Sequence, residues 1–234
     1  QFPADFIGEG LDQTRGWFYT LMVLSTALFD KPAFKNVIVN GLILAEDGQK
    51  MSKSKKNYSP PDKILDTYGA DALRLYLINS PVVKAESMRF KDNELKQVIK
   101  EIHIPIYNMV SFLKQMSDLY NENSGEKFSP FDIINNNYKK EEIENNILDN
   151  WILQCLNQFI KMVHIDMAKY QLYSIVPRIK KFIDQLSRWY IKLNKQNMKM
   201  YNVTNKNSVF NSLSVLYNCL RYFVITCAPF CPFI

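Results

Sequence analysis

The sequence predicts an α/β segment over residues 1–90 followed by an all-α helical bundle, and three observations support this fold class. Short β-branched runs bounded by turn residues alternate with helical stretches in the first part. From residue 92 onward, apolar residues recur at helical spacing. Charge also divides the chain: residues 1–147 hold 18 Lys and Arg against 20 Asp and Glu, whereas residues 148–234 hold 11 against 3.

The first predicted elements are a helix over 11–29 and strands at 36–40 and 42–45. Apolar residues of the helix follow helical spacing, and Trp17 and Leu28 widen the apolar face, so we expect a helix that is buried nearly all round. The two strand candidates are short, apolar and bounded by Asn and Gly. A helix that leads into an apolar strand indicates one unit of a parallel α/β sheet.

Two shorter helices are predicted over 59–68 and 71–80. Ser59 is expected as the N-cap of the first, because prolines follow it in the first turn. Gly69 is expected to end that helix, and Pro81 to end the second.

The remainder of the chain is predicted to be helical apart from one polar stretch. A long helix is expected over 92–120 with a kink at Pro105, and residues 121–146 are rich in Asn, Glu, Lys and Ser, which favours a polar connection. Helices are then predicted over three ranges, 147–168, 172–200 and 208–228. We therefore expect three parts: residues 1–90, a helical connection over 91–147, and a helical domain over 148–234 that is truncated.

Composition limits the class of protein. No apolar leader and no run of about 18 uncharged apolar residues occurs, so we expect a cytoplasmic protein without a membrane span. The chain starts without methionine and stops after an apolar helix, so we expect it to be part of something longer. We interpret the four cysteines as buried small side chains, with a metal site as the weaker alternative: Cys155, Cys219, Cys227 and Cys231.

Residues 48–57 form a basic loop between a predicted strand and a predicted helix. Four of its residues are lysines within a run of seven, and their mutual repulsion would be relieved by an anion. Lysine suits phosphate, and small serines let backbone N–H groups approach it closely. The pattern is not a P-loop. Phosphate binding is the functional interpretation, and a solvated loop or a basic targeting patch is the alternative.

A second basic feature lies on the helix around residues 178–200. Its cations recur at spacings of 4, 3 and 4: Arg188, Lys192, Lys195 and Lys199. The opposite stripe is apolar: Ile179, Phe182, Ile183, Leu186, Trp189, Tyr190 and Leu193. We expect no carboxylate at i+4 to balance the cations. This face is predicted to bind RNA in a salt-dependent way; a solvated lysine face, or a basic scaffold for proteins, is the alternative.

Several motifs together resemble one family. Lys50–Ser54 (Lys-Met-Ser-Lys-Ser) is similar to the signature loop of class I aminoacyl-tRNA synthetases. The resemblance extends over nearly the whole chain, weakest at 121–146, through these segments: 6–19, 40–44, 68–74, 187–190 and 228–233. The run Asp-Gln-Thr-Arg-Gly-Trp most resembles the isoleucyl-tRNA synthetases of the eukaryotic cytosolic type, as opposed to the valyl, leucyl and methionyl ones.

The resemblance implies a fold and a set of roles. The α/β segment would be the second half of a Rossmann-like nucleotide-binding fold, and the helices would form a tRNA anticodon-binding domain. Lys50 and Lys53 would be catalytic, stabilising the phosphates of ATP while an amino-acid carboxylate attacks the α-phosphorus. Trp17 would line the amino-acid pocket, with an ordinary core position as the alternative. The remaining implied residues would bind ATP or the adenylate: Glu9, Gly10, Asp12, Gln13, Gly41, Ile43, Met51, Ser52 and Ser54.

The resemblance also implies partners. These are ATP with Mg²⁺ as part of the substrate, isoleucine, tRNA, and the missing N-terminal half of the same polypeptide, with no structural metal. Neither His103 nor His164 lies in the His-x-Gly-His context that this family carries in its first half, so the fragment alone is expected to be inactive. Two alternatives stay open: a valyl- or leucyl-type synthetase, and a non-catalytic tRNA-binding module.

Overall fold

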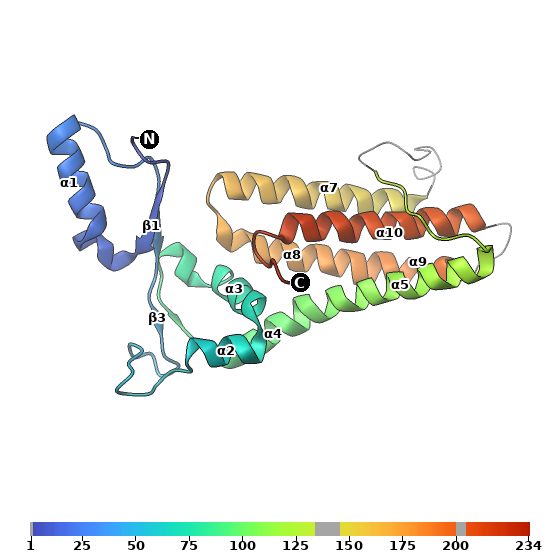
Figure 1. The fold of residues 1–234 in the computed structure, drawn as a ribbon, viewed down its shortest axis with the longest axis horizontal. Coiled ribbons are helices and arrows are strands. Elements are labelled where there is room, and N and C mark those ends of the chain that lie inside the picture. Colours follow the sequence, from blue (N-terminus) through green and yellow to red (C-terminus); the bar gives the residue numbers. More distant parts are fainter. Residues whose placement is uncertain (1, 134–145, 200–204) are drawn as a thin grey trace.

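A computed structural model describes residues 2–133, 146–199 and 205–234 of the chain. In Figure 1 a helix lies apart at one end of the molecule, short strands and helices lie in the middle, and long helices form a bundle at the other end. The molecule is mostly helical with a small sheet portion, in the predicted order of α/β first and helices second. Within the described ranges, no helix has both the length and the apolar character needed to cross a membrane.

In the described residues, four short strands form two separate two-stranded sheets. β1 (Ile7–Gly10) pairs with β2 (Val37–Asn40), and β3 (Ile43–Leu44) pairs with β4 (Met88–Arg89). Both strands predicted after residue 35 are present, and each pairs in parallel with another strand, although the two do not pair with each other. The sequence pattern does not predict β4, because two residues are too few to show alternation.

Helix α1 (Trp17–Phe29) follows a 3-10 turn (Leu11–Arg15). The helix predicted from residue 11 is interrupted because Gly16 adopts φ −138° and ψ −116°, outside the helical region. The predicted burial of α1 is wrong: Trp17 is 50% exposed and Leu28 is 70% exposed. The reason is that the described elements cover α1 on one side only, and Figure 1 shows it projecting away from the bundle.

Helices α2 (Pro61–Tyr68) and α3 (Ala70–Ile78) are separated by Gly69, whose φ of +81° ends the first helix as predicted. The prediction of Ser59 as the N-cap is wrong, because α2 begins at Pro61 and no side chain caps it. A proline disfavours the helical conformation in the residue before it, so residue 60 is extended and the helix begins at the second proline.

The long helix predicted from residue 92 is divided into three segments. These are α4 (Asp92–Val98), a π-helical turn (Ile99–His103) and α5 (Ile104–Ser124). The irregularity predicted at Pro105 takes the form of this π turn, which ends two residues before the proline. Proline lacks an N–H group and its ring clashes with the carbonyl four residues earlier, so a wider turn relieves the clash.

The three helices predicted after residue 146 are confirmed, and the middle one is divided. The first is α7 (Ile147–Ala168) and the last is α10 (Lys206–Cys227). Between them lie four consecutive segments: a 3-10 turn (Leu172–Ser174), α8 (Ile175–Asp184), a π segment (Gln185–Ile191) and α9 (Lys192–Lys199). Residue 200, the predicted end of the middle helix, lies outside the described residues.

The buried side chains form two hydrophobic clusters of very different size. The large core extends from Ile64 of α2 to Cys231 beyond α10, and three rings with centroids 5.3 to 5.5 Å apart lie within it: Phe159, Phe182 and Phe223. The small cluster consists of three buried side chains from β1, α1 and the loop before β2: Ile7, Phe18 and Phe34. Helices α2 and α3 and strand β4 therefore pack with the bundle, although they precede residue 90.

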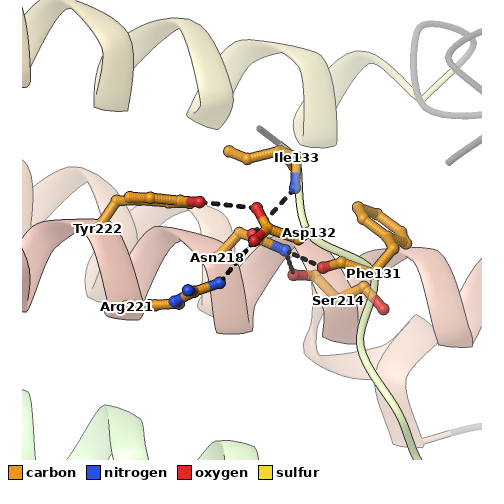
Figure 2. A network of polar contacts seen from close by, with 7 residues as sticks. All are labelled: Phe131, Asp132, Ile133, Ser214, Asn218, Arg221 and Tyr222. Carbon is orange, nitrogen blue, oxygen red and sulfur yellow. Dashed lines mark hydrogen bonds and ion pairs between the residues drawn. The ribbon is translucent and has the colours of Figure 1, made fainter. Parts of the chain in front are cut away.

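Within the polar connection predicted over 121–146, residues 121–124 belong to α5, most of residues 122–130 are exposed, and residues 131–133 pack against the bundle; residues 134–145 lie outside the described residues. Phe131 is buried. As Figure 2 shows, Asp132 accepts hydrogen bonds from two side chains of α10, Arg221 at 2.9 Å and Tyr222 at 2.7 Å. Asn218 holds the backbone on both sides of Asp132, at distances of 2.7 and 3.3 Å. Composition alone does not predict this docking.

Candidate functional site

The turn after β1, here called the carboxylate turn (residues 9–13), holds the exposed carboxylates of Glu9 and Asp12. Glu9 Oε2 accepts the N–H of Gly10 at 3.1 Å, and Asp12 Oδ2 accepts a hydrogen bond from Gln13 Nε2 at 3.1 Å. A Cβ on Gly10 would lie 2.7 Å from Asp12 Oδ1, so Asp12 can fold over this position only because it is glycine. Local bonds therefore hold both carboxylates at the carboxyl end of β1.

Gln13 also has a structural role that the sequence does not reveal. Its Oε1 accepts the N–H of Trp17 at 2.9 Å and so caps the first turn of α1, where N–H groups have no helical partner. A Cβ on Gly16 would come within 2.8 Å of the same oxygen, so a larger residue there would require the Gln13 side chain to shift. Trp17 follows the carboxylate turn and is half exposed in the described chain.

Gly41, which follows β2, is required by packing within the chain. Its N–H donates to the carbonyl of Val82 at 2.8 Å, and a Cβ on it would lie 1.8 Å from the carbonyl oxygen of Glu86. That N–H is therefore not available to a ligand. The backbone groups of Ile43, unlike the N–H of Gly41, are not used by a neighbouring segment of the described chain. In a parallel ladder, alternate residues of a strand bond to the same neighbouring strand. The β4 segment bonds to residues 42 and 44, so the N–H and carbonyl of Ile43 face away from it.

The lysine loop (residues 48–57) begins with a tight turn. The N–H of Ala45 donates to the carbonyl of Gln49 at 2.9 Å, and the N–H of Gly48 donates back to Ala45 at 2.9 Å. Gly48 has φ +82°, a conformation that favours glycine, and a Cβ there would lie 3.1 to 3.2 Å from the guanidinium of Arg89 on β4. This turn fixes the direction in which the loop leaves β3.

Asn57 closes the lysine loop, a role that the sequence analysis does not assign to it. Its Oδ1 accepts the N–H of Ser52 at 2.9 Å, and its Nδ2 donates to the carbonyl of Lys50 at 3.2 Å. The hydroxyls of Ser52 and Ser54 lie 2.7 Å apart. The signal available in the sequence is that Asn side chains commonly bond to nearby backbone in turns.

The two lysines proposed as catalytic extend from this closed loop. Lys50 and Lys53 are exposed, and in the part of the chain that the structure describes neither ammonium group has a hydrogen-bond or ion-pair partner. Lys55 differs, because its Nζ donates to Gln49 Oε1 at 2.7 Å. The loop therefore presents two unneutralised cations on a backbone that is held in place, an arrangement suited to an anion.

The carboxylate turn and the lysine loop leave the sheets in the same direction. β1 and β2 are parallel with Gly10 beside Asn40, and β3, which leads into the lysine loop, begins three residues after Asn40. Both segments thus follow the carboxyl ends of strands, where ligands bind in open α/β sheets, and Figure 1 shows the loop beyond β3. Within residues 2–133, no hydrogen bond or ion pair joins the two segments directly.

The four cations of the predicted RNA-binding face are exposed along one helical stretch: Arg188, Lys192, Lys195 and Lys199. The prediction that no carboxylate balances them is wrong at Arg188, whose Nε lies 3.0 Å from Asp184 Oδ1; no ion pair of the other three occurs within the described residues. The predicted apolar stripe is also wrong at two positions, since Trp189 and Leu193 are each 56% exposed. The π segment over 185–191 widens the turn and shifts the register, so these two side chains rotate out of the core.

Each of the three carboxylates after residue 147 is engaged within the chain. Asp149 is 1% exposed and accepts hydrogen bonds from Tyr190 at 2.5 Å and Ser212 at 3.2 Å; burial raises the pKa of its carboxyl to about 6, against the effect of these bonds. The Arg178 guanidinium, 2.5 Å away, holds the pKa of Asp166 below its ordinary value. The lysines of the RNA-binding face are therefore exposed to solvent, with no free carboxylate nearby in the described part of the chain to neutralise them.

Metal ligands are not clustered in the described residues: no group of three or more His, Cys, Asp or Glu could hold an ion there. Cys155 is partly exposed. The other three cysteines are buried: Cys219, Cys227 and Cys231. His103 is partly buried in the π turn, and burial lowers the pKa of its imidazole. The structure assigns none of these groups to a reaction.

Comparison with known families gives two matches in the order of the two structural parts. Residues 1–89 match the family described as tRNA synthetases class I (I, L, M and V). Residues 149–234 match the anticodon-binding domain of tRNA ligase. The first match contains the carboxylate turn and the lysine loop, and the second contains the exposed cations of α9.

Curated relatives are similar along the whole chain. The cytoplasmic isoleucine–tRNA ligase of Arabidopsis thaliana is 48% identical over 233 residues, which are 99% of this chain and 19% of that protein. The cytoplasmic isoleucine–tRNA ligase of Mus musculus is also 48% identical, over 100% of this chain and 18% of that protein. The chain thus spans about a fifth of the length of these relatives.

Solved structures share the fold at low sequence identity. A methionyl-tRNA synthetase of Mycobacterium tuberculosis bound to methionyl-adenylate has a TM-score of 0.74 at 16% identity, over 99% of this chain and 43% of that chain. A LeuRS from Agrobacterium radiobacter K84, in a ternary complex with tRNA and LeuAMS, has a TM-score of 0.68 at 20% identity, over 98% of this chain and 26% of that chain. The arrangement of strands and bundle is therefore shared across this group.

Proposed function

The chain belongs to the class I tRNA synthetases of the isoleucine, leucine, methionine and valine group, and from this we propose that the protein it forms part of is an isoleucine–tRNA ligase. Such an enzyme activates isoleucine with ATP and transfers it to tRNA(Ile). The activity is proposed for a longer protein, because the chain spans about a fifth of its isoleucine–tRNA ligase relatives. The 234 residues alone are expected to be inactive.

One observation carries the proposal: the free cations of the lysine loop and the carboxylates of the turn after β1 both follow the carboxyl ends of parallel strands. The reaction forms a bond between the isoleucine carboxylate and the α-phosphorus of ATP, and breaks the bond to the β-phosphate so that pyrophosphate leaves. A carboxylate is already a nucleophile, so positioning and charge stabilisation supply most of the rate.

In this proposal Lys50 and Lys53 stabilise the charge on the phosphates. Their loop is closed by Asn57 before ATP binds, so little ordering is needed during the reaction. Backbone and side chains of Met51, Ser52 and Ser54 border the phosphates. Mg²⁺ enters with ATP, whose phosphate oxygens are its natural ligands.

The nucleoside end of ATP is assigned to the carboxylate turn. Glu9 and Asp12 accept hydrogen bonds from ribose hydroxyls, Gly10 permits close approach of the backbone, and Gln13 lies beside the carboxylate or α-phosphate. Gly41 and Ile43 border adenine, with Gly41 contributing its surface only, because its N–H is bound to Val82. Half-exposed Trp17 forms one wall of the isoleucine pocket.

The remaining assignments concern tRNA and architecture. Residues 1–90 serve as the second half of a Rossmann-like domain, 91–147 connect, and 148–234 bind tRNA through Arg188, Lys192, Lys195 and Lys199. An N-terminal half of the same polypeptide completes the ATP site. We place the protein in the cytoplasm, as the names of the plant and mouse relatives indicate for those proteins.

Isoleucine-dependent ATP–pyrophosphate exchange by the full-length protein tests the proposal. We expect exchange with isoleucine, weaker exchange with valine by a factor of about 10 to 200, and a large loss in Lys50→Ala and Lys53→Ala. The control is Lys63→Ala, an exposed lysine of α2 outside the loop. If valine or leucine supported the fastest pyrophosphate exchange, the protein would be a valyl- or leucyl-type synthetase. Binding of tRNA without any exchange would indicate a non-catalytic module.

A further inference from the structure

Helix α3 holds the end of α10 through hydrogen bonds between residues 155 to 162 positions apart. Arg74 donates from Nε to the carbonyl of Phe230 at 2.9 Å and from Nη2 to the carbonyl of Pro229 at 2.8 Å. Asp71 accepts the N–H of Phe233 at 2.8 Å. These three bonds are called the α3 clamp below.

The chemistry of the α3 clamp suits its position. The carbonyls of Pro229 and Phe230 lie in the segment that follows α10, and a guanidinium with a planar set of donors binds both of them at once. Asp71 is 4% exposed; the backbone N–H of Phe233 donates to its Oδ2, and its Oδ1 has no hydrogen-bond partner in the described residues.

The α3 clamp adds direction to a contact that is otherwise apolar. Leu75 and Tyr76 of α3 lie in the large core together with side chains of α8 and α10. Apolar burial is non-directional, so it holds α3 against the bundle without fixing its rotation. Hydrogen bonds have strict geometry, so the three bonds of the clamp fix the orientation of α3 relative to the segment that follows α10.

The two ends of this connection carry the two proposed sites. Helix α3 follows the lysine loop through α2, with Gly69 alone between the two helices. Helix α10 packs against α9, which carries Lys192, Lys195 and Lys199. The α3 clamp is therefore a direct polar connection between the support of the lysine loop and the helices that carry the RNA-binding face.

We propose that Arg74 and Asp71 are positioning residues that fix the bundle relative to the lysine loop, so that a tRNA bound along the cationic face presents its acceptor end at the site of adenylate formation. This inference rests on the proposed function. It separates two steps: amino-acid activation does not involve the cationic face, whereas transfer to tRNA needs that face and the lysine loop held in a fixed relative orientation.

The test compares Arg74→Met and Lys63→Met in the full-length enzyme. Lys63 is an exposed cation of α2 whose side chain makes no bond in the described residues, so it is the matched control. For Arg74→Met we expect isoleucine-dependent pyrophosphate exchange and the dissociation constant for tRNA to stay within about twofold, while single-turnover transfer to tRNA slows about 10-fold, because two charge-assisted bonds are lost. Lys63→Met should change none of the three. Arg74→Lys, which keeps the charge and one donor, should recover part of the loss.

Four outcomes would overturn the inference. If Arg74→Met transferred isoleucine to tRNA at the wild-type rate and kept pyrophosphate exchange, the positioning role of the clamp would be refuted and the proposed function would stand. Exchange and transfer that fall together, or an Arg74→Lys that behaves like Arg74→Met, would show that Arg74 supports only the fold. Wild-type enzyme without isoleucine-dependent exchange would refute the proposed function and the clamp with it.

Discussion

The carboxylate turn and the lysine loop are attached to bodies of very different size. The carboxylate turn lies on β1 and α1, whose buried apolar side chains are only those of the small cluster, Ile7, Phe18 and Phe34. The lysine loop lies between β3 and α2, and both Met88, beside β3, and Ile64 of α2 belong to the large core. Apolar burial stabilises a fold in proportion to its area, so the first region should open far more readily than the second.

The exposed apolar face of α1 follows from the same difference within the described residues, since the small cluster covers only one side of that helix.

Core substitutions should show the largest contrast. Phe223 is 1% exposed with two rings about 5.5 Å away, so Phe223→Ala should lower the free energy of unfolding of the main transition by about 3–5 kcal/mol. Phe34→Ala, in the small cluster, should change that transition by less than about 1 kcal/mol while speeding amide exchange in β1 and β2. Urea unfolding followed by circular dichroism, with hydrogen exchange, measures both. Equal losses from the two substitutions would contradict the separation of the clusters.

The pH dependence of stability should belong to the large core, because the small cluster contains no titratable side chain. Burial raises the pKa of Asp149 from 3.8 to about 6 in the folded chain. The folded state therefore holds this proton more tightly, and the associated stability is full below about pH 3.8 and lost as the pH rises through 6, by up to about 3 kcal/mol.

Asp149→Asn should remove this pH dependence. The amide oxygen can still accept from Tyr190, so we expect an unfolding free energy that no longer falls between pH 4 and 7 through this group, and a variant more stable than the wild type at pH 7. Urea titrations at several pH values measure the slope. A wild-type slope that persists in the variant would contradict the assignment to Asp149.

Closure of the lysine loop should affect activity more than stability. Asn57→Ala removes two hydrogen bonds of the loop, each contributing about 1 kcal/mol locally, so we expect kcat/KM for ATP in pyrophosphate exchange to fall about 10-fold. The midpoint of urea unfolding should stay within experimental error, because Asn57 lies outside the large core. Normal exchange by this variant would show that ATP orders the loop without Asn57.

Single substitutions on the RNA-binding face should have the smallest effects, and these effects should differ from one cation to another. Lys195→Ala should reduce the salt dependence of tRNA binding by about one unit of slope, because one phosphate contact is lost. Arg188→Ala should reduce it by less, because Asp184 already neutralises part of that charge. Filter binding over a range of salt concentrations measures the slopes. Equal slopes for Arg188→Ala and Lys195→Ala would show that the ion pair opens when RNA binds.

The elements that follow from local pattern were predictable. Helical spacing predicted the helices after residue 146, and β-branched runs predicted β2 and β3. Burial of α1 was not predictable, because spacing shows that a face is apolar and not whether another element covers it. The predicted burial of Trp189 and Leu193 is wrong for a different reason. A π segment adds a residue to the turn, and a pattern based on 3.6 residues per turn does not reveal it.

The residues of the candidate site come from two different signals. Four lysines within seven residues predict an anion site from charge alone, whereas Glu9 and Asp12 are implied only by the resemblance to the synthetases. Asn57, the Gln13 cap and the Arg74 contacts depend on backbone groups brought close by folding, which no spacing shows. Asp184 lies four residues before Arg188, one turn toward the start of the helix, and pairs with it there.

Hydrogen–deuterium exchange of the full-length protein, with and without ATP and isoleucine, can decide whether one nucleotide joins the two regions. We predict that the ligands slow exchange together in residues 7–16 and in residues 49–57. Protection confined to one of these segments would contradict the account, because the carboxylate turn and the lysine loop would then not share a ligand.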